Sequence, residues 1–185
     1  APAAYCVGSP SNPVLFSSSF GVAGTSFAWT NSNAAIGLAA TGNGNIASFT
    51  TTNATNQSIS GNIVVTPSAN GCSGNSSNFN LTVNPIPTVN SVANQVKCNG
   101  TLSDAITFSG AVPGTIYNWT NNNTSINLGA SGSGNIPTFT LTNTSNTPIT
   151  ATITVTPTYN FAGTICTGAT TSFTITVNPT PTVNR

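Results

Sequence analysis

The chain carries two copies of one sequence pattern, and this internal repeat limits what it can fold into. Residues 24–67 align with residues 114–157 without a gap, so Trp29 corresponds to Trp119 at an offset of 90 positions. The offset grows to 94 positions near the end of each copy, because the second copy contains a four-residue insertion. Each copy has roughly 90 residues, the size of a single β-sandwich domain. We therefore predict two tandem domains, at residues 1–85 and 86–179.

The junction between the copies is rich in proline. The motif Asn-Pro-x-Pro occurs at residues 84–87 and again at residues 178–181, which contain Pro85, Pro87, Pro179 and Pro181. Proline fixes its own φ and biases the preceding residue to extended geometry, so this linker is short and semi-rigid. Because the second copy ends in the same motif, we expect residues 180–185 to begin a linker to a further copy. We also expect a copy before the first one.

Apolar residues alternate with Thr or Asn along much of the chain. Residues 79–83, 149–157 and 173–177 show this most clearly, and no segment has sustained helical periodicity. A period of two with β-branched residues predicts half-buried strands and argues against disorder. The predicted strands span residues 4–7, 13–18, 25–31, 46–51, 58–66 and 78–84 in the first copy, and 94–98, 105–109, 115–121, 136–142, 148–156 and 171–178 in the second, with short extra strands near 35–39 and 125–129. Six or seven strands per copy predict an all-β fold of two immunoglobulin-like sandwiches.

Two aromatic residues recur in the third predicted strand of each copy. Phe27 and Trp29 in the first copy, and Tyr117 and Trp119 in the second, are two positions apart and so share one face of their strand. We interpret these side chains as core residues. The alternative is an exposed platform on which sugar rings stack.

Charged residues make up only 2% of the chain, and His is absent. Lys97, Asp104 and Arg185 cannot supply a carboxylate pair or a catalytic triad, and they form no cationic patch for phosphates. Zinc and calcium sites need ligands that this composition lacks. No apolar run approaches the length that crosses a bilayer. We therefore predict no catalytic residue, metal, cofactor, nucleic-acid partner or membrane insertion.

The same lack of charge predicts self-association. Sheet edges are normally protected by charged side chains or proline, and a surface with net charge near zero tends to associate. Lys97 is nearly the only such guard in this chain. We expect further copies of the repeat to be the main partners, as a filament.

The four cysteines follow the repeat. Cys6 corresponds to Cys98, and Cys72 corresponds to Cys166. Among the three possible pairings, only Cys6–Cys72 with Cys98–Cys166 respects the repeat and keeps both bonds inside domains. We predict these two disulfides and an oxidising, extracellular compartment. Buried free thiols are the alternative.

One longer pattern resembles a known family. Residues 117–158 combine the strings Tyr-x-Trp-Thr-Asn-x-Asn, Ser-Gly-x-Gly-Asn-Ile-Pro-x-Phe-Thr and Ala-Thr-Ile-Thr-Val-Thr-Pro-Thr, with a weaker echo at residues 27–67. This pattern resembles the PKD-like repeats of very large Bacteroidetes cell-surface proteins, including gliding-motility-type adhesins. The Gly-Cys-x-Gly string at residues 71–74 is also similar, whereas the second copy departs from it at residues 165–168. The resemblance implies an Ig/PKD-type sandwich, export to the cell surface, and a role as a stalk or adhesive repeat.

These observations lead to two hypotheses about function. The first is a non-enzymatic extracellular structural or adhesive repeat that forms part of a stalk or filament of a large bacterial surface protein. The alternative is a carbohydrate- or surface-binding module, either an adhesin proper or an accessory domain of a secreted enzyme. In that alternative, the Asn- and Thr-rich loops at residues 51–58 and 121–125 would bind surface glycans through hydrogen bonds.

The composition also predicts how stability depends on pH. Stability changes with pH only through groups that titrate differently in the folded and unfolded states. Lys97, Asp104, the tyrosines and the termini are nearly the whole titratable set besides the cysteines. We expect a nearly flat melting temperature from mildly acidic to mildly basic pH, with little salt dependence, in differential scanning calorimetry. A shift of many degrees over this range would contradict the reasoning.

Overall fold

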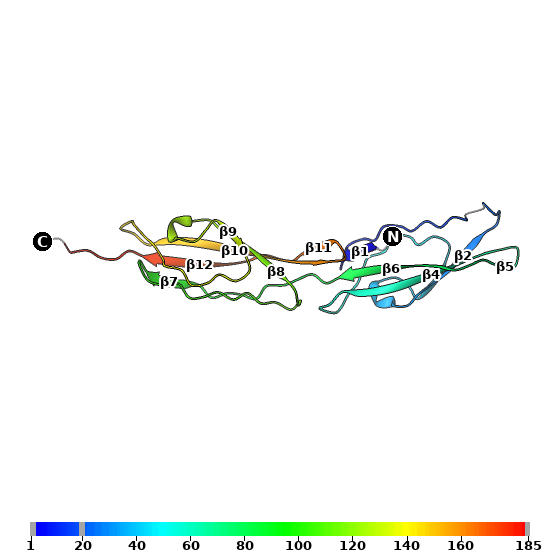
Figure 1. Ribbon diagram of the computed structural model, residues 1–185, viewed down its shortest axis with the longest axis horizontal. Helices are drawn as coiled ribbons and strands as arrows, with labels where there is room; N and C mark the ends of the chain where they lie inside the picture. Colours follow the sequence, from blue (N-terminus) through cyan, green and yellow to red (C-terminus); the bar gives the residue numbers. More distant parts are fainter. Residues whose placement is uncertain (1–2, 19–20, 184–185) are drawn as a thin grey trace. The chain divides into compact units, whose positions relative to one another are not determined.

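The computed structural model describes residues 3–18 and 21–183 and divides the chain into two compact units (Figure 1). Unit 1 comprises Ala1–Ile86 with Asn160–Cys166, and unit 2 comprises Pro87–Tyr159 with Thr167–Arg185. The division follows the sequence repeat except at residues 160–166. This segment belongs by sequence to the second copy but folds as part of unit 1. Residues 184–185, the end of the predicted linker, lie outside the described residues, as do residues 1–2 of the first copy.

Each unit is built on one six-stranded sheet with the same topology. The sheet of the first copy has the strand order β1-β6-β4-β2-β3, with β5 paired to β4, and that of the second copy has the order β7-β12-β10-β8-β9, with β11 paired to β10. Most of β11 nevertheless folds as part of unit 1. The strands of the first sheet are β1 (Ala3–Cys6), β2 (Ser26–Asn31), β3 (Thr41–Asn43), β4 (Ile59–Ala69), β5 (Cys72–Ser73) and β6 (Ser77–Asn84). Those of the second are β7 (Gln95–Cys98), β8 (Ile116–Asn121), β9 (Ser131–Ser133), β10 (Ile149–Phe161), β11 (Thr164–Thr167) and β12 (Thr171–Asn178).

The strand register shows that equivalent residues occupy equivalent places. Strand β1 runs parallel to β6, and its last residue, Cys6, lies opposite Asn84. Strand β7 runs parallel to β12 in the same way, and its last residue, Cys98, lies opposite Asn178. The repeat in the sequence is therefore a repeat in three dimensions.

The layer that faces each sheet is less regular than the sequence suggested. Predicted strands at residues 13–18 and 46–51 are extended segments joined by the isolated bridge Val14–Ile46, and residues 105–109 and 136–142 are joined likewise by Ile106–Ile136. Val14 and Ile46 contribute to the hydrophobic cluster of unit 1, so this layer covers the sheet without forming a continuous ladder. The fold is all-β, with two sandwich-like domains.

The short extra strands predicted near residues 35–39 and 125–129 are wrong. These segments contain the 3₁₀ turns η1 (Ala34–Ile36) and η2 (Thr124–Ile126). The side chain of Asn33 accepts a hydrogen bond from the Ala35 N–H, and Asn123 does the same for Ser125, so a local cap competes with strand pairing. Neither turn is long enough to cross a membrane, and the described residues contain no helix that is.

Alternation along the strands separates the core from the surface. In β10, Ile153 and Val155 are fully buried, while Thr150 and Thr154 on the other face bond to hydroxyls of β12 at 2.9 and 3.0 Å. These cross-strand hydroxyl pairs occupy positions where ion pairs often lie in other sheets. The sheet surface is therefore held together by neutral hydrogen bonds.

Trp119 shows how tightly one edge of the sheet packs. It lies opposite Gly132 of β9, and the Trp29–Gly42 pair repeats this arrangement in unit 1. A methyl group on Gly132 would overlap the Trp119 indole ring. Glycine is needed here because the ring covers its Cα.

We expect Gly132→Ala to lower the free energy of unfolding by about 1–3 kcal/mol, the usual cost of overpacking. Gly129→Ala is the matched control, because Gly129 is exposed and a methyl group there meets nothing closer than 3.8 Å. Chemical denaturation of the two variants measures the difference. Equal midpoints would mean that the indole does not lie over Gly132.

Candidate functional site

Few side chains of this chain can bind a metal ion or react chemically. Within the described residues, no group of three or more His, Cys, Asp or Glu side chains is placed to hold a metal ion. Lys97 Nζ and Asp104 Oδ1 form an ion pair at 2.8 Å on the surface of unit 2. This pair joins β7 to a loop, and both side chains are partly or largely exposed. The cysteines are therefore the reactive side chains to consider.

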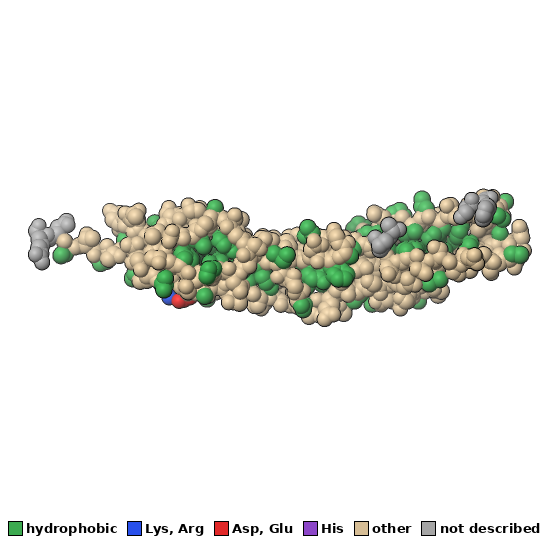
Figure 2. Space-filling model, viewed as in Figure 1, with side chains coloured by type: hydrophobic (Ala, Val, Ile, Leu, Met, Phe, Trp, Pro, Cys, Tyr) green, Lys and Arg blue, Asp and Glu red, His purple; other side chains and the backbone are tan. Residues whose placement is uncertain are grey.

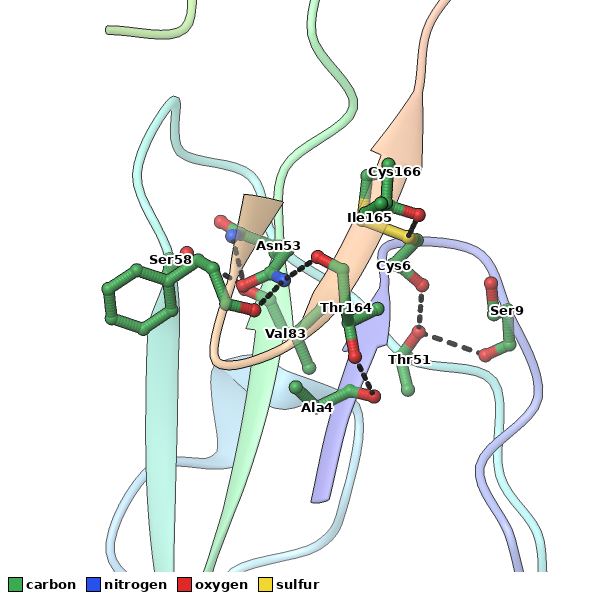
Figure 3. The surroundings of a disulfide bond; sticks show 12 residues. Ala4, Cys6, Ser9, Thr51, Asn53, Ser58, Val83, Thr164, Ile165 and Cys166 are labelled. Carbon is green, nitrogen blue, oxygen red and sulfur yellow. Dashed lines mark hydrogen bonds between the residues drawn. A yellow bond between two sulfur atoms is a disulfide. The ribbon is translucent and has the colours of Figure 1, made fainter. Parts of the chain in front are cut away.

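Cys6 and Cys166 form a disulfide in unit 1 (Figure 3). Cys6 ends strand β1, and Cys166 lies on β11, the second strand of the β10–β11 hairpin. Their Cα atoms are 5.6 Å apart, although the residues are 160 positions apart in the sequence. The bond ties the hairpin of the second copy to the first strand of the first copy.

Hydrogen bonds seat the hairpin around this disulfide (Figure 3). Thr164 Oγ1 donates to the carbonyl oxygen of Ala4 at 3.1 Å. Asn84 Nδ2 donates to the carbonyl oxygens of Phe161 at 3.0 Å and Thr164 at 3.4 Å, and Asn84 is completely buried. Thr51 Oγ1 donates to the carbonyl oxygen of Cys6 at 2.8 Å. The polar groups brought together here are thus paired, as burial requires.

The predicted pairing of Cys6 with Cys72 is wrong, and strand register gives the reason. Cys6 lies beside Asn84, at the end of the sheet where β4 begins with Ile59. Cys72 lies opposite Ala69, at the other end of β4. Ten residues of strand separate these ends by about 33 Å, whereas a disulfide needs Cα atoms within about 7 Å. The bond could not form inside this domain.

The predicted pairing of Cys98 with Cys166 is also wrong. Cys166 is bonded to Cys6, and Cys98 lies at the end of unit 2 where β10 begins with Ile149. Cys72 and Cys98 are free and exposed, so the alternative of buried thiols does not describe them either. Repeat symmetry alone is compatible with two bonds that both lie within domains. The same symmetry also allows bonds between neighbouring copies, and strand direction distinguishes the two possibilities.

The predicted aromatic residues lie in the two cores. Trp29 and Trp119 are 7% and 8% exposed, and each belongs to the buried cluster of its unit. Phe27 and Tyr117 are half-buried and pack against the same clusters. The Trp rings therefore offer no exposed face for sugar stacking.

The first Pro-x-Pro linker packs where it enters unit 2. Pro85 and Pro87 are buried, whereas Pro179 is half-buried and Pro181 is exposed. After Pro87 the chain bonds to the loop that follows Phe108. The Asn90 N–H donates to the Ser109 carbonyl oxygen at 2.8 Å, and the Ala111 N–H donates to Thr88 Oγ1 at 3.0 Å. Val89 and Val92 pack against the core of unit 2.

A groove of about 1240 Å³ lies on unit 1, and we call it the unit 1 groove. Its walls include Val14, Phe16, Phe27, Pro67 and Phe79, and Cys72 also lines it. Hydrophobic side chains gather on this face of unit 1 in Figure 2. The groove is thus a large, mainly apolar surface feature of unit 1.

Comparison with known proteins identifies the repeat type. Residues 94–181 match the family model described as PKD-like domain. A solved structure of the first two immunoglobulin domains of DIP-gamma is similar, with 10% identity and a TM-score of 0.44, over 95% of this chain and 93% of that one. A comparison with curated proteins finds no match. The second copy is thus similar to PKD-like domains.

Proposed function

We propose that this chain is a non-enzymatic structural repeat, part of the extracellular stalk or filament of a large bacterial surface protein of the kind found in Bacteroidetes. The observation that carries the proposal is the Cys6–Cys166 disulfide, because it joins one repeat covalently to the next. A catalytic domain has no need of such a bond, whereas a stalk under tension gains directly from it. The match of residues 94–181 to PKD-like domains supports the same role.

The disulfide changes how force passes through the chain. When the two ends are pulled apart, tension runs through residues 1–6, across the sulfur–sulfur bond, and on through residues 166–185. Residues 7–165 lie outside this path and carry no tension. Strand β1 (Ala3–Cys6), the last residues of β11 and strand β12 (Thr171–Asn178) lie on this path, whereas the rest of each sheet lies outside it. Force at the ends therefore cannot release the length of chain between residues 7 and 165.

The proposed location is the cell surface. A disulfide persists in oxidising, extracellular compartments and is rare in the cytosol. PKD-like domains are typically extracellular, which agrees with this location. Neutral hydrogen bonds in place of ion pairs also suit a surface exposed to changing salt and pH.

The loops expected to bind glycans are engaged in the fold. Asn53 Nδ2 donates to the carbonyl oxygens of Gln57 and Val83, and Asn53 Oδ1 accepts from the Thr55 N–H. Asn121 and Asn123 make similar bonds within unit 2. Side chains that hold their own loops in shape have little capacity left for a sugar. The carbohydrate-binding alternative is the weaker proposal for this reason.

Force spectroscopy on single molecules tests the structural role. We expect the oxidised chain, tethered through terminal peptide tags, to show no domain-sized unfolding steps. After reduction the same chain should lengthen by up to roughly 550 Å, since 160 residues are released. Cys6→Ser should behave like the reduced protein without any reductant. Domain-sized steps in the oxidised protein would contradict the proposal.

A further inference from the structure

We propose that the unit 1 groove and Cys72 of one copy receive the C-terminal segment Pro179–Val183 and Cys98 of a second copy, in a head-to-tail joint closed by a Cys98–Cys72 disulfide. This inference deepens the proposed structural function and rests on it. It names the partner, a second copy of this chain, and the residues that each copy contributes. Two independent observations carry it.

The first observation is that unit 2 already contains a filled version of the groove. Phe108 and Phe173 are 6% and 2% exposed, with ring centroids 6.4 Å apart. Val89 and Val92 of the linker pack against the cluster that contains both rings. Pro87 lies against Gly168, the residue whose N–H donates to the carbonyl oxygen of Pro157. The linker thus covers one side of the core of unit 2.

The described residues cover the same surface of unit 1 less completely. Phe16 and Phe79 are the counterparts of Phe108 and Phe173, with centroids 6.5 Å apart, but both are only half-buried. Pro67 and Gly74, the counterparts of Pro157 and Gly168, line the groove together with these rings. The groove therefore has the lining that the linker occupies in unit 2. Its fitting occupant is a segment with the linker's sequence.

The C-terminal segment of the chain is such a segment. Residues 179–183 read Pro-Thr-Pro-Thr-Val, and the linker at residues 85–89 reads Pro-Ile-Pro-Thr-Val. Val89 packs against the core of unit 2, whereas its counterpart Val183 is 88% exposed. An exposed valine and an uncovered aromatic groove are complementary apolar surfaces, and burying both is favourable.

The second observation concerns the two free thiols. Cys98 is the counterpart of Cys6, and Cys72 is the counterpart of Cys166, and these counterparts are bonded to each other in unit 1. The residue beside Cys98 is also more exposed than the residue beside Cys6, as expected if Cys98 still lacks a partner hairpin. Asn84 beside Cys6 is completely buried under the hairpin, whereas Asn178 beside Cys98 is only half-buried.

Both observations assign the same roles to the two copies. The donor copy supplies Pro179–Val183 and Cys98, which both belong to unit 2. The acceptor copy supplies the groove and Cys72, which both belong to unit 1. Because donor and acceptor surfaces differ, the contact is heterologous and each copy can engage two neighbours, which generates a chain rather than a closed dimer.

The covalent step is thiol–disulfide exchange with a small disulfide such as oxidised glutathione. The Cys98 thiolate attacks one glutathione sulfur, forms a mixed disulfide and releases one glutathione thiolate. The Cys72 thiolate of the other copy then attacks the Cys98 sulfur and releases the second glutathione thiolate. The two cysteines lose two electrons and two protons, and one glutathione disulfide becomes two glutathione thiols.

Two complementary variants test the joint. Cys72→Ser keeps only the donor thiol, and Cys98→Ser keeps only the acceptor thiol. In a glutathione redox buffer we expect each variant alone to remain monomeric on a non-reducing gel and an equimolar mixture to give a disulfide-linked dimer. Peptide mapping should find Cys98 joined to Cys72, with Cys6–Cys166 intact. Equal homodimer formation by either variant alone would show unspecific oxidation and overturn the proposal.

Val183→Asp tests the groove, and the acceptor copy provides the matched control. In the Cys72→Ser donor, an aspartate at position 183 would have to enter an apolar groove, so we expect dimer formation to slow by about tenfold. In the Cys98→Ser acceptor the same substitution lies outside the joint and should change nothing. Ser131→Asp, on exposed strand β9, controls for added charge in the donor. If Val183→Asp changes the rate of dimer formation equally in the donor and in the acceptor, the assignment of the groove is overturned.

The outcomes separate this inference from the proposed function. Failure of the mixture to dimerise would overturn the joint between copies, while the Cys6–Cys166 bond and its effect under force would stand. Domain-sized unfolding of the oxidised chain under force would overturn the structural role, whatever the mixture does.

Discussion

Backbone pairing along the long strand β10 is the interaction on which the rest of unit 2 depends. It bonds to β12 on one side and to β8 on the other, and it buries Ile153 and Val155 completely. Because β10 continues to Phe161 and turns back as β11, the pairing that builds the core also projects the hairpin that carries Cys166. The β10–β11 hairpin therefore contributes both to the core and to the disulfide. Strand β4 and Cys72 repeat the arrangement in unit 1.

Asparagine side chains form hydrogen bonds to backbone groups that charged side chains often form in other domains. Asn31 and Asn121 donate to the carbonyl oxygens of Leu38 and Leu128, and so fix the same turn in each unit. Asn143 Nδ2 donates to the carbonyl oxygens of Thr147 and Val177 and is buried. Neutral amides satisfy backbone groups without the desolvation penalty of a charge. The near absence of charge is thus compatible with a well-paired polar structure.

The sequence predicted the central strands well, because alternation marks a half-buried strand directly. The strands expected at residues 25–31 and 148–156 correspond to β2 and β10. The facing layer was predicted less well, since bridges such as Val14–Ile46 leave the same apolar pattern as a full ladder. The prediction of the cysteine pairing was wrong because composition and symmetry do not determine which end of a sheet a residue occupies. The unit 1 groove could not be predicted, because it emerges only when the burial of Phe16 is compared with that of Phe108.

Hydroxylamine cleavage of the unsubstituted protein tests whether the Cys6–Cys166 disulfide connects the two repeats. After the free thiols are blocked, hydroxylamine cuts Asn–Gly bonds, which here follow Asn43, Asn70 and Asn99. We predict that residues 1–43 remain joined to residues 100–185 until a reductant is added, while residues 71–99 separate at once. If residues 71–99 stay linked to residues 1–43 and to residues 100–185 without reductant, the disulfides lie within the domains and no bond connects the two repeats.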